Sequence, residues 1–258
     1  MANQILNTPG GAGQVPAGQV FVGAKQNGQY MTGFTDKIFV IDLENLPDPL
    51  NPLHLPSNTV RVRTNDGNVP LKDMGKATHA TYDTAVLVPG TTDVYDVYKS
   101  GSSFENLFYW SINIVEVLGA NSKGITNTQY MFKNCDAFTT ISTIFDTSSV
   151  TNMLGMFHNC QALTSVPLFD TSNVTSMRAM FEFDGELTTI PLFNTSKVID
   201  MERMFEFCNK VQSGALALYQ QASSQANPPT NHNNTFYHCG YDTETGAAEL
   251  AQIPYEWK

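Results

Sequence analysis

The sequence contains little charge and, in particular, few basic residues. Charged residues make up 15% of the 258 positions, whereas about 25% is typical of a soluble domain. The 14 basic and 24 acidic side chains give a formal net charge of −10 at pH 7. Because this excess of negative charge repels phosphates, a nucleic-acid partner is not expected. The hydrophobic content of 41% excludes disorder caused by excess charge.

Long apolar segments are missing as well. No stretch approaches the roughly 18 consecutive apolar residues that indicate a transmembrane helix. The N-terminal stretch has neither the basic nor the apolar segment of a secretory signal peptide. We therefore expect no membrane insertion, and a complete gene product that does not leave a cell by the usual secretory route.

The common catalytic and cofactor motifs are absent. The segment Gly10–Gly13 lacks both the Lys that would follow in a phosphate-binding loop and a preceding strand. The five histidines show no metal-ligand spacing. Cys239 follows His238 directly, but adjacent side chains in an extended chain point apart, and no third activating group is evident. We expect a protein that is not an enzyme, with no catalytic residue, cofactor or metal.

The sequence does contain an internal repeat. The pair Met-Phe recurs with spacings of 25, 24 and 24 residues, at Met131-Phe132, Met156-Phe157, Met180-Phe181 and Met204-Phe205. After each of the first three pairs, the same order of Phe or Leu, Thr, Ile or Val, and then Phe, Asp or Asn, Thr and Ser follows. A fixed period in the range of 20–50 residues is typical of repeat architectures.

Each repeat unit is predicted to form one short strand and one short helix. Apolar side chains at positions i, i+3, i+6 and i+7, such as Val150, Met153, Met156 and Phe157, would share one helical face, which Ser148 could cap. The Leu-Thr-x-Ile/Val segment favours a strand that ends at a proline. Stacked units would bury the apolar faces that one unit cannot bury alone. The sequence therefore predicts an α/β repeat solenoid.

Polar residues and cysteines also keep the repeat register. We interpret the Asp of the Phe-Asp-Thr-Ser segment as a turn and capping residue, with a calcium ligand as the alternative. Cys135, Cys160 and Cys208 each lie four residues after the Met of their unit, and Asp184 takes this place in the remaining unit. A metal or redox ladder is one interpretation of this column, and a column of small buried side chains is the favoured one. All four cysteines are expected to be reduced.

The repeat resembles a known family. From Met156 to Met177 the chain reads Met-Phe-x-x-Cys-x-x-Leu-Thr-x-Val-Pro-x-Phe-Asp-Thr-Ser-x-Val-Thr-x-Met. This pattern resembles the BspA-type leucine-rich repeat, also described as a mycoplasma-type surface-protein repeat, over about residues 120–211. The resemblance implies leucine-rich-repeat-like coils and non-catalytic recognition or adhesion on an exterior surface. Occurrences of the family include bacterial surface proteins and proteins encoded by tailed phages of gut bacteria.

The segments on either side of the solenoid at 119–211 are expected to cap it, because an exposed end must be covered. Residues 57–118 are predicted to be a β-rich N-terminal cap. Its strands are expected at 58–66, 84–88, 94–98 and 114–118. Residues 212–258 are predicted to be a C-terminal cap, with helical stretches at 215–221 and 247–251.

Residues 1–56 are predicted to form an extended N-terminal anchoring arm. Two strand candidates, at 20–24 and 38–43, precede a stiff segment with four prolines. The arm contains too little apolar sequence for a core of its own, so another subunit is expected to complete its strand edges. The candidate anchoring residues are Val20, Phe21, Val22, Ile38, Phe39 and Val40.

The sequence thus predicts a non-enzymatic virion structural protein of the head, neck or tail, which is anchored by its arm and displays the repeat. The alternative is a bacterial cell-surface adhesin with BspA-like repeats. Expected partners are other virion proteins or copies of the chain, and a host-surface protein or glycan is the candidate ligand. The candidate binding residues, one in each repeat strand, are Thr140, Ser165 and Thr189.

Overall fold

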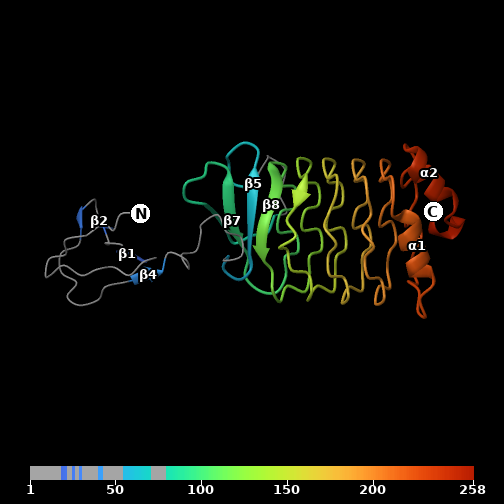
Figure 1. Ribbon diagram of the computed structural model, residues 1–258, viewed down its shortest axis with the longest axis horizontal. Coiled ribbons are helices and arrows are strands. Elements are labelled where there is room, and N and C mark those ends of the chain that lie inside the picture. Colours follow the sequence, from blue (N-terminus) through green and yellow to red (C-terminus); the bar gives the residue numbers. More distant parts are fainter. Residues whose placement is uncertain (1–18, 22–24, 27–28, 31–39, 43–54, 71–79) are drawn as a thin grey trace. The chain divides into compact units, whose positions relative to one another are not determined.

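The structure is a computed structural model that describes residues 19–21, 25–26, 29–30, 40–42, 55–70 and 80–258 (Figure 1). The chain divides into two compact units, Met1–Asp48 and Pro49–Lys258. The described residues form mostly sheet and turns, with few helices. No helix among them is long and apolar enough to cross a membrane.

The described residues of the first unit form two antiparallel strand pairs. Strand β1 (Gln19–Phe21) pairs with β4 (Val40–Asp42), and β2 (Lys25–Gln26) pairs with β3 (Gln29–Tyr30). The two strand candidates of the arm therefore pair with each other, so that one edge of each is completed within the chain. Three of the candidate anchoring residues lie outside the described residues: Val22, Ile38 and Phe39.

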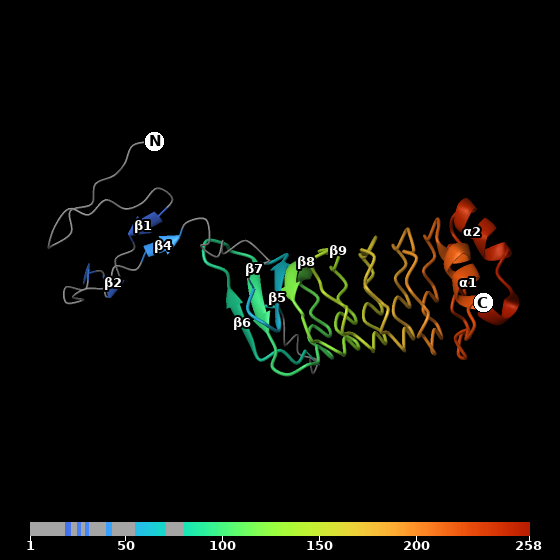
Figure 2. The same ribbon diagram turned by 60° about the horizontal axis from the view of Figure 1, so that its bottom comes forward.

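The second unit begins with a five-stranded sheet in the order β6-β7-β5-β8-β9 (Figure 2). Its strands are β5 (Thr59–Thr64), β6 (Thr84–Leu87), β7 (Val94–Tyr98), β8 (Ile114–Asn121) and β9 (Thr140–Ile141). All pairings are antiparallel except that of β8 with β9. The four strands expected between residues 57 and 118 are confirmed.

The central strand β5 is buried on both faces. Val60 and Val62 are fully buried in the hydrophobic core. On the opposite face, the buried side chain of Arg61 donates two hydrogen bonds to the Asp96 carboxylate on β7, with distances of 2.7 and 2.8 Å. Two parallel hydrogen bonds thus pair the guanidinium group with the carboxylate. The sheet can therefore bury an Arg at a position where burial on its own would favour an apolar residue.

Beyond the sheet, successive repeat units lie side by side as similar coils (Figure 1). Parallel bridges join equivalent residues of neighbouring coils. They connect Ser103, Asn127, Asn152, Ser176, Asp200 and Asn231 in one continuous series. The parallel pairing of β8 with β9 begins a second series, on the side of the predicted repeat strands.

The expected helix in each repeat unit is wrong. Residues 125–213 contain no α-helix, and the Val-to-Phe segments form consecutive turns instead. In one unit, Tyr130 and Asn134 have positive φ values of 53° and 60°, which a right-handed helix excludes. The main chain bonds to the next coil rather than within a helix, for example from Phe132 N to Met156 O at 2.8 Å. The apolar spacing fits these turns as well as it fits a helix.

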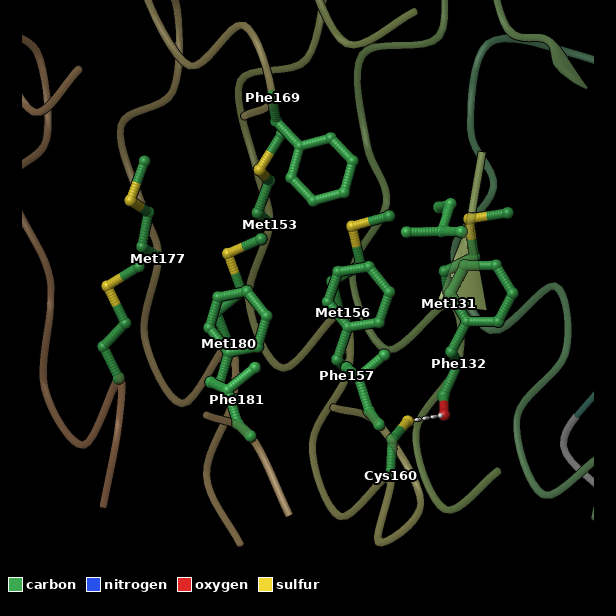
Figure 3. Close-up of a cluster of buried hydrophobic side chains, with 14 of the residues drawn as sticks. Met131, Phe132, Met153, Met156, Phe157, Cys160, Phe169, Met177, Met180 and Phe181 are labelled. Carbon is green, nitrogen blue, oxygen red and sulfur yellow. Dashed lines mark hydrogen bonds between the residues drawn. The ribbon is translucent and has the colours of Figure 1, made fainter. Parts of the chain in front are cut away.

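The buried Met and Phe columns are confirmed (Figure 3). The four repeat methionines, Met131, Met156, Met180 and Met204, are all fully buried. The phenylalanines that follow them stack ring on ring, with centroid distances of 5.5 Å between Phe132 and Phe157, 5.4 Å between Phe157 and Phe181, and 5.2 Å between Phe181 and Phe205. These columns form the continuous core that one unit could not form alone.

The C-terminal part contains the helices α1 (Ala215–Ser223) and α2 (Glu244–Ala251) and a 3-10 helix at Tyr255–Trp257. Both helical stretches expected from the sequence are confirmed. Trp257 is buried and stacks at 6.3 Å on Phe236, the last ring of the Phe column. This contact covers the apolar end of the column.

Candidate functional site

The candidate binding residues Thr140, Ser165 and Thr189 are all exposed. Thr140 is paired with Glu116 of β8 and Thr189 is bridged to Ser213, on the side of the coils that continues the sheet. We call this side the strand face. Ser165 has no strand pairing, so the strand expected in its repeat unit is wrong, because residues 163–166 are irregular. Their exposure leaves these side chains accessible to a partner, and their role in binding stays a prediction.

A second side of the coils carries larger side chains. It is made by the turn segments that contain the positive-φ residues, and we call it the turn face. The segments are 105–110, 129–134, 154–159, 178–183, 202–207 and 233–238. The four middle segments direct a Met-Phe pair inward, and the first and last direct Leu107-Phe108 and Thr235-Phe236 inward. Several residues that flank these pairs are at least partly exposed, such as Tyr130, Phe183 and Arg203. The main chain of one segment donates to the carbonyls of the next, for example from Ala179 N to Glu202 O at 2.8 Å, so that equivalent residues are aligned.

Aromatic rings form a continuous row on the C-terminal part of the turn face. We call this row the aromatic ridge. It consists of five rings of the turn segments and of Tyr241, which follows the last segment and contacts His238. The five rings are His158, Phe183, Phe207, Tyr237 and His238. Phe183 and Phe207 are stacked at 5.1 Å, and His158 meets Phe183 edge-on at 5.7 Å. Phe183 is 42% exposed and Tyr241 is 62% exposed. These rings are thus exposed to solvent and are not part of the hydrophobic core.

Charged side chains border the ridge. Arg203 contacts three glutamates, with its Nε 3.4 Å from Glu206 Oε2 and 3.6 Å from Glu202 Oε1, and its Nη1 3.9 Å from Glu182 Oε1. Arg178 forms a two-pronged ion pair with Glu202. The contacts of Arg203 with Glu182 and of Arg178 with Glu202 join consecutive coils, so they fix the two guanidinium groups at the surface of the turn face.

Two of these glutamates are nearly buried. Glu182 and Glu206 are each 7% exposed, and His158 Nδ1 lies 3.2 Å from Glu182 Oε2. Burial raises the pKa of Glu206, and the negative charge of Glu182 raises it further, while Arg203 opposes both effects. The described residues contain no group of three or more His, Cys, Asp or Glu side chains that could hold a metal ion. The carboxylates are engaged by Arg and His side chains of the same face.

The N-terminal part of the turn face combines aromatic rings with a lysine. The Lys133 Nζ lies 4.6 Å from the ring centroid of Tyr130 and 5.7 Å from that of Tyr109, which are cation–π distances. Burial among these rings lowers the pKa of Lys133. Trp110 meets Tyr109 edge-on at 6.3 Å. Aromatic side chains therefore occupy both ends of the turn face.

The cysteines are buried structural residues. All four thiols are free and buried. Three of them donate to main-chain carbonyls of the neighbouring coil, and burial raises the pKa of each. Because a thiol is reactive only as its thiolate, these side chains are poor nucleophiles. The interpretation of the column as small buried side chains is confirmed.

The Asp of the Phe-Asp-Thr-Ser segments forms turns, as expected. The Asp146 and Asp170 carboxylates accept hydrogen bonds from Ser148 N and Ser172 N at 2.9 and 3.0 Å. They cap no helix, since none follows. The neighbouring Thr147 is buried and donates to Asp170 O of the next coil at 2.9 Å.

The turn face is not predicted by the apolar spacing of the repeat. That spacing indicates helices with one buried face and assigns no role to their other positions. A signal was present in the repeated Phe-Glu-Phe at 181–183 and 205–207. Its outer phenylalanines have no place in the buried columns, and their period of 24 residues predicts adjacent rings once the units are stacked.

A family described as "Mycoplasma protein of unknown function, DUF285" matches residues 101–219. The match covers the coils from the first turn segment to the start of α1, and it agrees with the mycoplasma-type, BspA-like pattern in the sequence. The chain is similar to this surface-protein family in that region. No curated protein and no solved structure matches the chain.

Proposed function

We propose that this chain is a non-enzymatic surface-recognition protein that binds its partner through the turn face. One observation carries the proposal: exposed rings of the aromatic ridge lie beside Arg178 and Arg203 on one continuous face. Aromatic and Arg side chains contribute most of the binding energy in many protein interfaces. Contiguous exposed apolar surface on a soluble protein marks interaction sites.

The resemblance to BspA-type repeats supports the same function, because it implies recognition or adhesion on an exterior surface. In finer detail, we propose a leucine-rich-repeat-like solenoid. Its ligand would be a host-surface protein or glycan, since the net charge of −10 disfavours nucleic acid.

The proposed platform is a tailed-phage particle, with residues 1–56 as the anchor and other virion proteins or further copies of the chain as partners. A bacterial cell surface is the alternative platform. The separate N-terminal unit, Met1–Asp48, is compatible with an anchoring role in either case. Mass spectrometry of purified particles and of cell-envelope fractions distinguishes the two platforms, because the protein should be enriched in only one of them.

Binding through the turn face is tested with paired variants of the full chain. The labelled protein is applied to arrays of immobilised glycans and to a panel of bacterial and host surface proteins. Phe183→Ala combined with Phe207→Ala should reduce binding at least tenfold, as expected from the loss of about 1.4 kcal/mol or more.

Exposed leucines provide the matched control. Leu168 and Leu192 occupy equivalent positions of consecutive coils and are 65% and 55% exposed. Their replacement by Ala removes similar exposed apolar surface from another side of the coils and should leave binding unchanged. Equal losses in both variants would argue against the turn face. Loss only on replacing Thr140, Ser165 and Thr189 by Ala would assign binding to the strand face.

A further inference from the structure

Asp184 interrupts the cysteine column with a buried carboxyl group. In the three other coils, the thiol at this position donates to the carbonyl of a Phe in the neighbouring coil. These bonds are Cys135 Sγ to Phe108 O at 3.1 Å, Cys160 Sγ to Phe132 O at 3.0 Å and Cys208 Sγ to Phe181 O at 3.0 Å. Each cysteine of the column therefore donates one hydrogen bond to the coil before it.

The acceptors follow the same pattern. Phe132 O and Phe181 O each accept a second hydrogen bond, from the N–H of a turn within their own coil. Phe157 O also accepts such a turn bond, from Cys160 N at 3.0 Å. The register of the column puts position 184 where a thiol in the other coils donates the second hydrogen bond to the equivalent carbonyl. A carboxylate has no proton to donate there, whereas a carboxylic acid has one.

Only one of the two carboxyl oxygens of Asp184 has a hydrogen-bond partner. Its Oδ1 accepts from Cys160 N at 2.7 Å, and its Oδ2 is buried without a hydrogen-bond partner. Asp184 is fully buried, and no ion pair of the described residues includes it. The titratable groups that interact with this site are the Cys160 and Cys208 thiols, and Glu182 acts on Cys208. None of these groups supplies the positive charge that a buried carboxylate needs.

We propose that Asp184 carries a proton in the folded chain and that its Oδ2 hydroxyl donates to Phe157 O, so that this carboxyl group is a proton-dependent joint between two coils. Loss of the proton leaves a buried, unpaired charge and removes the only donor to the second site on Phe157 O. Ionisation therefore loosens the contact between the coils that carry Phe157 and Phe181.

Burial supports this assignment, because it raises the pKa of Asp184 well above its ordinary value. The sign of the effect follows from linkage. A carboxyl group with a raised pKa in the folded state contributes stability that is fully present below its unfolded pKa, near 3.8, and that is lost as the pH rises through the folded pKa. The contact between the two coils is therefore most stable at acidic pH and becomes weaker as the pH rises.

The joint lies next to the turn face. Asp184 directly follows Phe183, whose ring joins His158 to Phe207 in the aromatic ridge. Opening the joint would therefore disturb the ridge. The proposal for Asp184 itself does not depend on the recognition function, since it concerns only the protonation state and the contact between coils.

The test compares full chains that carry Asp184, Asp184→Asn or Asp170→Asn. The amide of Asp184→Asn can accept from Cys160 N and donate to Phe157 O, but it does not titrate. Asp170→Asn is the matched control, because Asp170 is exposed and the equivalent turn of the next unit contains Asn194. Denaturant unfolding and amide hydrogen exchange of residues 157–184, corrected for the intrinsic pH dependence of exchange, are measured between pH 4 and 9.

For the unaltered chain, the equilibrium constant for unfolding should contain a component that rises about tenfold per pH unit between the unfolded and folded pKa of Asp184. Asp184→Asn should remove this component, and Asp170→Asn should retain it. An unchanged pH slope in Asp184→Asn would overturn the proposal.

Two further measurements keep the test decisive if Asp184→Asn does not fold. Asp184→Cys restores the thiol of the other coils and should show the same loss of pH dependence. Infrared difference spectra of the unaltered chain should contain the band of a protonated, buried carboxyl group at pH 6. Absence of that band would show that Asp184 is ionised and would refute the joint.

Discussion

The ring of Tyr130 lies directly against the main chain of Gly155 in the next coil. A β-carbon on Gly155 would stand 2.4 Å from Tyr130 Cε1, which is closer than such contacts allow. Gly155 also has a positive φ of 56°, but Ala179 and Arg203 adopt positive φ at the equivalent positions of the following coils. The tyrosine ring, rather than the backbone conformation alone, therefore requires glycine at this position.

Gly155→Ala should lower the free energy of unfolding by about 1–3 kcal/mol, because the methyl group overpacks the contact with Tyr130. Tyr130→Ala in the same chain should relieve most of this loss. A double-mutant cycle by urea unfolding measures the coupling between the two positions. If the losses of the two single variants simply add, the steric explanation fails.

Phe181→Ala should lower the free energy of unfolding by about 3–5 kcal/mol, because it removes a fully buried ring from the middle of the stacked column. Hydrogen exchange should show the loss first in the coils that contact this ring. Leu192→Ala, at an exposed site, should change the unfolding free energy by about 0.5 kcal/mol or less. A similar effect for both variants would contradict the buried column.

Thr171→Val should destabilise the chain by about 1–3 kcal/mol. Its buried hydroxyl donates to Asn194 O of the next coil at 2.9 Å, and valine leaves that carbonyl without this donor. Thr175→Val is the control, since the Thr175 hydroxyl makes a similar bond to Thr151 O at 3.1 Å but is exposed, so water can replace it. Thermal or urea unfolding measures the loss of stability in each of the two variants. Equal effects would show that burial of the bond does not matter.

All four cysteines should be unreactive in the folded chain and titrate as free thiols after denaturation without reductant. The physical reason is that burial excludes the reagent and raises the pKa of each thiol, so little thiolate forms at neutral pH. Ellman's reagent measures the number of reactive thiols in the folded chain and, with guanidinium chloride, in the denatured chain. Fewer than four thiols in the denatured sample would reveal a disulfide and reverse the prediction of reduced cysteines.

Deletion of residues 1–48 should leave the sheet and coils folded, because the remaining residues, Pro49–Lys258, form a compact unit of their own. Circular dichroism and hydrogen exchange of residues 80–258 should match those of the full chain. The shortened chain should also lose its attachment to the particle or cell surface. Retained attachment would show that the anchor lies elsewhere.

The sequence alone determined the repeat period, the buried Met and Phe columns, the strands β5 to β8 and both C-terminal helices. These features depend on which residues are apolar and become buried, and the spacing of apolar residues is visible in short stretches of the sequence. The period of 24 or 25 residues also placed Cys135, Cys160, Asp184 and Cys208 in one column before any contact was known.

Only the tertiary structure decided between helix and turn in the repeat units. The apolar spacing of Val150, Met153, Met156 and Phe157 fits both, and the choice depends on main-chain hydrogen bonds to a coil 24 or 25 residues away. Stacking likewise brought Phe183 beside Phe207 and sealed Asp184 from water. Such contacts join residues far apart in the chain. They stabilise the protein only when the coils are packed against one another, so the sequence of a single repeat unit does not predict them.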